Sequence, residues 1–168
     1  DSGNVKIGVP TITTTLRGLV DGIIEVDQPM RPIHSGVGGG VVPDAFMVLS
    51  RIISSFHDDK GNLMIEGLTS TDMKVTELEE SFPKKMLGSD DITLFDTESI
   101  SKRLWLEPAL DVLAIDAPPV KEAVNLVIPK ARAKVSLRLP PTEDPDHAMK
   151  MLEAVSYTHL RAHETIHY

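Results

Sequence analysis

The sequence of 168 residues has no cysteine, few aromatic residues and no long hydrophobic run. Without cysteine the chain forms neither disulfides nor thiolate metal sites, which suits a reducing compartment. Aromatic residues make up 4% of the chain and the net charge is −8, so neither base stacking nor a phosphate-binding surface is expected. No apolar stretch approaches the roughly 18 residues of a membrane span, and we expect no signal peptide. These absences predict a soluble, cytoplasmic protein that binds neither nucleic acid nor membranes.

What remains is the composition of a folded domain. Hydrophobic residues make up 41% of the chain and charged residues 25%, and a chain of this length can bury a substantial core. The chain begins at Asp1 rather than at methionine. We therefore expect one domain, cut from a longer protein.

The spacing of apolar residues predicts three strands and two helices. Strands are expected over residues 16–26 and 131–139, where apolar and polar positions alternate, and over residues 109–117, an apolar run that Pro118 and Pro119 close. Helices are expected to begin at Pro43 and, with Asp144 as cap, at Pro145. Between the first helix and the second strand, residues from about 60 to 105 are polar and predict an insertion with one or two short helices. This order predicts an α+β, ferredoxin-like domain: an antiparallel sheet with two helices on one face, lacking its last strand.

One histidine stands in a glycine-rich loop, residues 32–43, between a predicted strand and a predicted helix. The loop contains four glycines: Gly36, Gly38, Gly39 and Gly40. A folded domain retains glycine where the backbone turns sharply or approaches another group closely. The pattern favours His34 as a side chain held within reach of a ligand. A lone loop histidine is, however, more often a cap or a solvated side chain.

The end of the chain contains a motif typical of zinc peptidases. Residues 163–167 read H-E-x-x-H, in which two histidines one helical turn apart bind zinc and the glutamate acts as a base. The chain ends one residue after His167, which leaves no third ligand downstream. Residues 155–165 also resemble a translated transposase adapter from sequencing libraries. We therefore interpret residues 155–168 as a non-native tail rather than as a zinc site.

Five segments of the sequence form a set of motifs: D-S-G-N at 1–4, P-T-I-T-T-T-L-R-G at 10–18, I-H-S-G at 33–36, N-L-V-I-P at 125–129 and A-R-A-K-V-S-L-R-L at 131–139. In order and spacing these motifs resemble the lid or dimerisation domain of the di-zinc peptidases, the family of carnosinase, aminoacylase and the diaminopimelate and ornithine deacylases. The resemblance runs from Asp1 to about Ala154 and is to the dipeptidase branch. It implies that residues 1–15 end the catalytic domain and its linker and that residues 16–154 form the lid.

The resemblance implies a catalytic role for His34 and a metal-binding role for Asp1. His34 corresponds to the lid histidine that reaches across the dimer and donates a hydrogen bond to the oxyanion formed at the scissile amide. Asp1 corresponds to an aspartate that ligates one of the two zinc ions, and a carboxylate is an ordinary zinc ligand. The alternative for Asp1 is a frayed terminal residue of a truncated chain.

The same resemblance implies substrate contacts at Arg138 and Asn125. Arg138 corresponds to the lid arginine that binds the substrate carboxylate, and its planar guanidinium suits bidentate binding. The alternative is a surface arginine beside Arg132 and Lys134. The position before V-I-P, often threonine in the family, is Leu126 here and offers no hydroxyl. Asn125 is the candidate to replace that contact.

The implied parent is a di-zinc dipeptidase or amidohydrolase that cleaves dipeptides or related N-acyl amino acids. The resemblance implies two Zn²⁺ ions per active site, with Mn²⁺ or Co²⁺ as alternatives, and a homodimer formed through the lid. Because most metal ligands would lie outside this chain, we expect the chain alone to be inactive. The alternative is a stand-alone ferredoxin-like dimerisation or binding module without catalysis.

Overall fold

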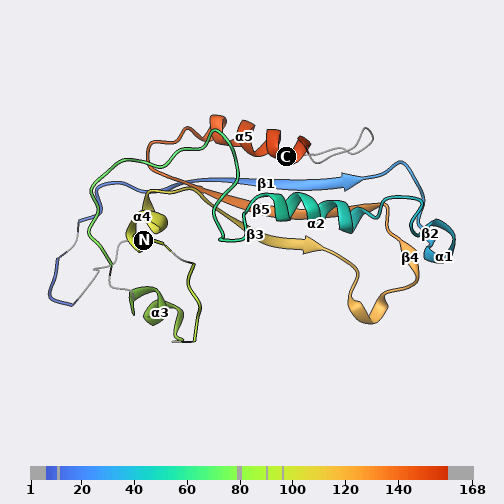
Figure 1. Ribbon diagram of the computed structural model, residues 1–168, viewed down its shortest axis with the longest axis horizontal. Helices are drawn as coiled ribbons and strands as arrows, with labels where there is room; N and C mark the ends of the chain where they lie inside the picture. The colour runs from blue at the N-terminus through green and yellow to red at the C-terminus, as the bar shows by residue number, and fades with distance from the viewer. Residues whose placement is uncertain (1–6, 11, 79–80, 90, 96, 159–168) are drawn as a thin grey trace.

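A three-stranded antiparallel sheet is the centre of the domain. The computed structural model describes residues 7–10, 12–78, 81–89, 91–95 and 97–158. The strands are β1 (Gly18–Asp27), β3 (Ala109–Asp116) and β5 (Lys130–Leu139), and their order in the sheet is β1-β5-β3 (Figure 1). The register pairs Gly18 with Leu139 and Asp27 with Lys130, so β1 and β5 pair along their whole length.

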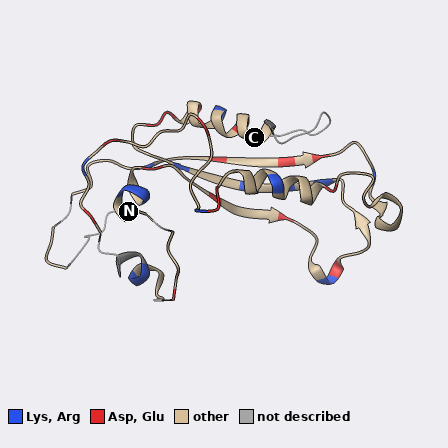
Figure 2. Ribbon diagram, viewed as in Figure 1, with Lys and Arg blue, Asp and Glu red and all other residues tan. Residues whose placement is uncertain are grey.

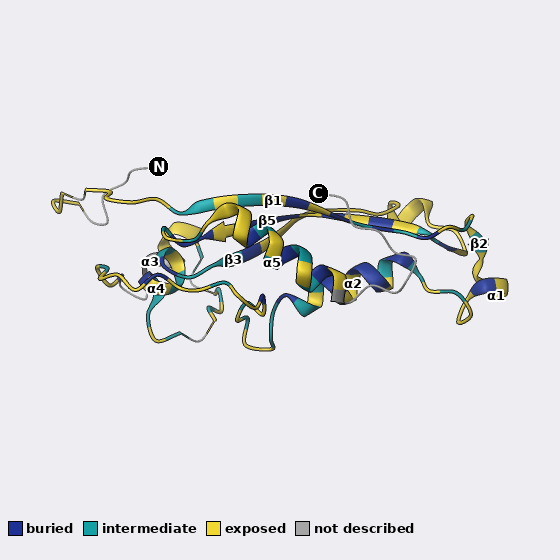
Figure 3. Ribbon diagram, turned by 90° about the horizontal axis from the view of Figure 1, so that it is seen from above, coloured by how far each residue is buried: buried dark blue, intermediate teal, exposed yellow. Residues whose placement is uncertain are grey.

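Two helices cover one face of this sheet. Helix α2 (Ala45–Ser55) and helix α5 (Pro145–Thr158) lie on the same side of the strands (Figure 3). The core between them is formed by alternate residues of the strands and by one stripe of each helix. Its buried members include Ile24, Val26, Ala45, Leu49, Ile52, Phe56, Ala131, Ala133, Val135, Leu137, Leu139, Ala148 and Leu152. The period-two and helical patterns of the sequence therefore point to the residues that are buried.

Both helices begin at an aspartate that caps their free N–H groups. Asp44 Oδ1 accepts from the Met47 N–H at 3.0 Å, and Asp144 Oδ1 accepts from the His147 N–H at 2.8 Å. The predicted start at Pro43 is therefore wrong by two residues, because the cap is Asp44 and Pro43 precedes it. The start at Pro145 is confirmed.

The segment between α2 and β3 contains little regular structure. It holds two short helices, α3 (Ser81–Leu87) and α4 (Ile100–Trp105), as the polar composition predicts. Before these helices, Leu63 forms an isolated bridge with His57.

A second, two-stranded ladder lies at the far end of the sheet. Strand β2 (Ile33–His34) pairs with β4 (Leu126–Val127), and helix α1 (Ser35–Gly38) follows β2 directly (Figure 1). A 3₁₀ turn, η1 (Val120–Glu122), lies in the β3–β5 connection. This ladder joins the glycine-rich loop to the segment before β5.

The ferredoxin-like α+β prediction is confirmed. Strand, helix, strand, strand and helix follow in the predicted order, and the described residues contain three of the four strands of such a sheet. The domain boundaries at residues 15 and 154 stay predictions. In the part of the chain that the structure describes, no helix is both long and apolar enough to cross a membrane.

Candidate functional site

His34 ends strand β2 and lies opposite Leu126 of β4. Its side chain is exposed, and its ring Nδ1 accepts a hydrogen bond from the Gly36 N–H at 3.0 Å. The imidazole thus caps helix α1, which agrees with the cap alternative of the sequence interpretation. In a neutral ring whose Nδ1 is an acceptor, the proton resides on Nε2. His34 therefore presents an N–H donor outward from the loop.

The glycines after His34 permit this geometry. A Cβ on Gly36 would lie 3.1 Å from His34 Nδ1, which is tighter than most Cβ contacts. A Cβ on Gly39 would lie 2.4 Å from the Ser35 carbonyl oxygen, a group that accepts the Gly39 N–H at 2.8 Å and closes the turn. A side chain at Gly39 is therefore excluded unless the backbone moves.

Asn125 lies beside His34. Its carbonyl oxygen accepts from the Ser35 N–H at 2.9 Å, so the chain just before β4 is tied to the residue just after His34. The side chain of Asn125 is exposed. The structure thus brings together two of the four predicted site residues.

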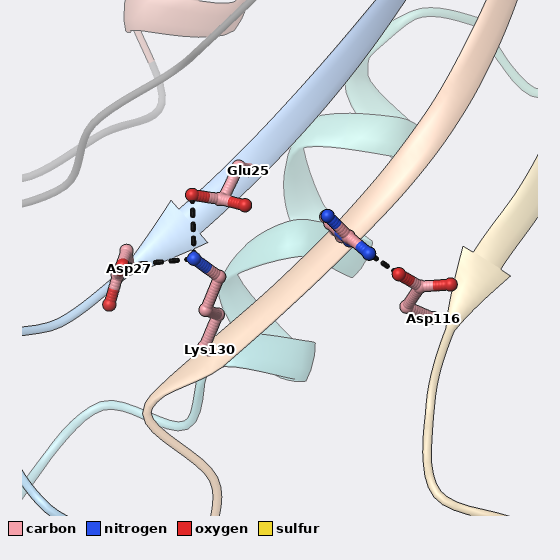
Figure 4. Close-up of polar contacts among 5 residues, drawn as sticks. Glu25, Asp27, Asp116 and Lys130 are labelled. Atoms are coloured by element: carbon pink, nitrogen blue, oxygen red, sulfur yellow. Dashed lines mark hydrogen bonds and ion pairs between the residues drawn. The ribbon is translucent and has the colours of Figure 1, made fainter.

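The open face of the sheet, opposite the helices, carries paired charges. Three of the cations that β5 presents there each contact a carboxylate of a neighbouring strand. Figure 2 marks the charged positions along the strands, and Figure 4 shows the contacts of Lys130 and of Asp116. The pairs are Lys130 with Glu25 (2.8 Å) and Asp27 (3.2 Å), Arg132 with Asp116, and Lys134 with Asp21 (3.5 Å). The hydrogen bond that Lys130 donates to Glu25, and after it the one that it donates to Asp27, raises the pKa of Lys130. Such exposed pairs contribute little stability, because water and salt screen the charges. Because each of these three cations already has a carboxylate partner, none of them is free to bind an anion from outside the chain.

Arg138 is the exception in this row. It lies on the same face of β5, opposite Leu19 on β1 and Ala109 on β3, so neither direct neighbour offers a carboxylate. Its side chain is exposed and, within the described ranges, takes part in no hydrogen bond or ion pair. An exposed guanidinium without a partner is free to bind an anion from outside the chain.

His34 and Arg138 lie at opposite ends of the domain. Strand β5 begins at Lys130, close after β4 and the His34 ladder, and runs toward Arg138 and helix α4 (Figure 1). Eight residues of extended chain separate Lys130 from Arg138, about 26 Å. One small substrate therefore cannot contact both side chains of the same chain.

The other predicted ligands are not assembled in the described residues. Asp1 and the H-E-x-x-H residues of the tail lie outside them. No three His, Asp or Glu side chains in the described ranges are grouped to hold a metal ion. His147 is no part of such a group, and its ring Nδ1 contacts Glu143 at 2.8 Å.

Sequence reasoning did not find Arg17, which lies directly before β1. Its Nη1 donates to the Leu104 carbonyl at 2.5 Å and its Nη2 to the Glu107 carbonyl at 3.0 Å, while Nε is buried without a partner. Burial, and after it the charge of Arg138, lowers the pKa of Arg17 below its ordinary value. Its partners are backbone groups nearly 90 residues away, which no local pattern reveals.

The sheet order and the two helices on one face define a ferredoxin-like α+β domain, and its candidate site residues lie at both ends of the sheet. The chain belongs to the M20 peptidase dimerisation domain family, whose sequence profile matches residues 14–164. The family resemblance drawn from the motifs is thereby confirmed.

The relatives of this chain include dipeptidases. The chain is 37% identical over 157 residues to a cysteinylglycine-S-conjugate dipeptidase of Corynebacterium striatum, which covers 91% of this chain and 34% of the relative. It is 27% identical over 165 residues to a Cys-Gly metallodipeptidase of Saccharomyces cerevisiae, covering 90% of this chain and 34% of the relative. The chain thus spans about a third of the length of these relatives.

Among solved structures, the fold matches an M20 family metallo-carboxypeptidase of Sulfolobus solfataricus. The TM-score is 0.75 with 23% identity, and the match covers 95% of this chain and 44% of that one. At this identity the likeness is evidence for the fold alone.

The comparisons do not support the interpretation of residues 155–168 as an adapter-derived tail. The family match extends to residue 164, and helix α5 continues to Thr158 with Ser156 buried. Ser156 Oγ donates to the Leu152 carbonyl at 2.8 Å within this helix.

Proposed function

We propose that this chain is the dimerisation domain of a metal-dependent dipeptidase in which Arg138 of one subunit and His34 of the other act on the same substrate. The observation that carries the proposal is that the unpaired Arg138 and the exposed His34 lie at opposite ends of the domain. Each side chain is free to bind a ligand, but within one subunit they are too far apart to contact the same small substrate. A second copy supplies the missing partner.

The free edge of β3 favours such a pairing. Within the described residues, strand β3 is paired on one side only, with β5, as is β1 at the opposite edge of the sheet. Val112, Leu113 and Ile115 are 38%, 55% and 53% exposed, an apolar row on an unpaired edge, which invites pairing with another strand. Two copies related by a twofold axis present this same strand to each other.

Antiparallel pairing of β3 with the β3 of a second copy would bring the two site halves closer. Within one chain, β3 begins at Ala109, opposite Arg138, and ends at Asp116, opposite Arg132 and toward the His34 end. In an antiparallel pair the start of one strand lies beside the end of the other. The end of the domain that carries Arg138 in one subunit would then lie next to the end that carries His34 in the other.

The chemistry of the two ends suits hydrolysis of a dipeptide with a free carboxylate. Arg138 would hold that carboxylate through its planar guanidinium, and the Nε2–H of His34 would donate to the oxygen that gains negative charge as the amide is attacked. Asn125, beside His34, offers an additional amide for the substrate. The names of the relatives point to dipeptides as the substrate class, and we extend no further than that class.

The metal ions belong to the rest of the parent enzyme in this proposal. The described residues contain no group of side chains that could hold a metal ion. Asp1 would therefore be one metal ligand, and the other ligands would come from parts of the parent enzyme outside this chain. Bound zinc, or Mn²⁺ or Co²⁺ in its place, would supply an activated water. The absence of cysteine suits the cytoplasm as the place of action.

The proposal is tested by His34→Ala in the full-length enzyme. Loss of one oxyanion donor lowers kcat by about 10²–10³-fold, while metal content and KM change little. His147→Ala, another exposed histidine of the same domain, is the matched control and should leave kcat unchanged. An unchanged kcat in His34→Ala would overturn the role of His34. A full-length protein without peptidase activity would instead favour the stand-alone binding module.

A further inference from the structure

Arg17 and Arg138 lie together at one end of the open face of the sheet. Gly18 pairs with Leu139 and Leu19 with Arg138, so Arg17 precedes β1 by one residue at a position diagonal to Arg138. Diagonal neighbours on one face of a sheet are typically about 7–8 Å apart. Two guanidinium groups thus share this end of the domain.

The side chain of Arg17 reaches across the end of β5. It starts on the β1 side, and the two carbonyl groups that it contacts, those of Leu104 and Glu107, lie just before β3. Because β5 lies between β1 and β3, the guanidinium passes the end of the strand that carries Arg138. Leu104 lies in the last turn of α4, where a cation is favourable.

The charge of Arg17 is held in place without being neutralised by an ion pair. Its partners are neutral carbonyl groups, its Nε is buried without a partner, and within the described ranges it forms no ion pair. Asp111 lies near enough to affect it electrostatically but not within ion-pair distance. Arg17 is half-buried, and withdrawing part of a cation from water without a carboxylate partner is costly, so retaining it beside a second free cation calls for a reason.

We propose that Arg17 is a positioning residue for the substrate carboxylate: a fixed positive charge that strengthens carboxylate binding at the exposed Arg138. This inference rests on the proposed function, because it takes Arg138 as the carboxylate group. Two adjacent cations repel each other in the empty site, and a carboxylate between or beside them relieves that repulsion. The site is thereby selective for substrates with a free carboxylate over neutral analogues.

A purely structural role predicts something different. If Arg17 only ties the segment after α4 to the start of β1, its loss weakens the fold and lowers activity on every substrate alike. If its charge acts on the carboxylate, its loss changes the preference between charged and neutral substrates. The ratio of kcat/KM for a dipeptide to kcat/KM for the same dipeptide with an amidated C-terminus separates the two roles.

The experiment uses the full-length enzyme with Arg17→Gln and Arg17→Lys. Glutamine is neutral but still donates to a carbonyl group, whereas lysine keeps the charge. We expect Arg17→Gln to lower the acid-to-amide ratio about tenfold, mostly through a higher KM for the acid, because a charge several ångströms from a carboxylate is removed. Arg17→Lys should retain most of the ratio.

Arg132→Gln is the matched control. It removes an arginine from the same face of β5 that is paired with Asp116 and distant from Arg138, so the ratio should not change. Equal ratios in wild type, Arg17→Gln and Arg17→Lys would overturn the inference. A wild-type enzyme that cleaves acid and amide equally well would instead overturn the role of Arg138 in the proposed function, whatever the Arg17 variants do.

Discussion

The hydrogen bond from Gly36 N–H to Nδ1 gives His34 two tasks in one side chain. It caps helix α1 and, by accepting at Nδ1, directs the remaining ring proton to the exposed Nε2. A solvated histidine would sample both tautomers and several rotamers. The cap therefore orients the donor before any substrate arrives, which is the condition under which an oxyanion donor is effective.

The turn that carries His34 is predicted to tolerate no side chain at residue 39. Gly39→Ala would force the new methyl group against the Ser35 carbonyl, lowering the free energy of unfolding by about 1–3 kcal/mol. Chemical denaturation of the full-length protein measures this. Ser35→Ala, an exposed change in the same turn, should stay within about 0.5 kcal/mol of wild type. Equal stability of the two variants would mean that the loop rearranges freely.

His34 and Arg138 could be chosen as candidates from motifs, whereas Arg17 could not. A histidine among glycines and an arginine at a set position in a strand are visible in the sequence. Arg17 is a single arginine before a strand, and its partners are carbonyl groups of Leu104 and Glu107, which any residue possesses. Only the fold brings them together.

At the scale of elements, the long strands and helices were predictable and the short ladder was not. β5 has five alternating buried residues and α2 a clear apolar stripe, so their patterns are readable. β2 and β4 have two residues each, too few for any period. Their pairing depends on the backbone hydrogen bond from Ser35 to Asn125 and on where the sheet ends. Both are features of the tertiary structure, which a local sequence pattern does not reveal.

The exposed edge of β3 makes a prediction about assembly. Ile115→Lys in the full-length enzyme places a charge in the apolar row of the free edge, and edge charges oppose strand pairing. We expect the dimer to dissociate at least about tenfold more readily, measured by analytical ultracentrifugation.

Ile23→Lys is the control for this variant. Ile23 is 44% exposed against 53% for Ile115, but it lies on β1, at the opposite edge of the sheet from β3. The dimer should therefore survive this change. If both lysine variants dimerise like wild type, the β3 edge is not the interface.

At the scale of the whole molecule, the domain has its binding groups at its two ends. The core and the two helices keep His34 and Arg138 apart at a distance set by the length of β5, about 26 Å. Within one chain this separation prevents the two side chains from contacting the same small substrate. In the proposed dimer it would determine how far each subunit reaches into the active site of the other.

Complementation between two inactive variants tests this arrangement most directly. His34→Ala and Arg138→Met subunits, carrying different tags, are co-expressed as full-length chains and the mixed dimer is purified. If the residues act across the dimer, one of its two sites contains both Arg138 and His34, and activity returns to about half that of the wild-type dimer. Both homodimers remain nearly inactive. A mixed dimer as inactive as the homodimers would contradict the account.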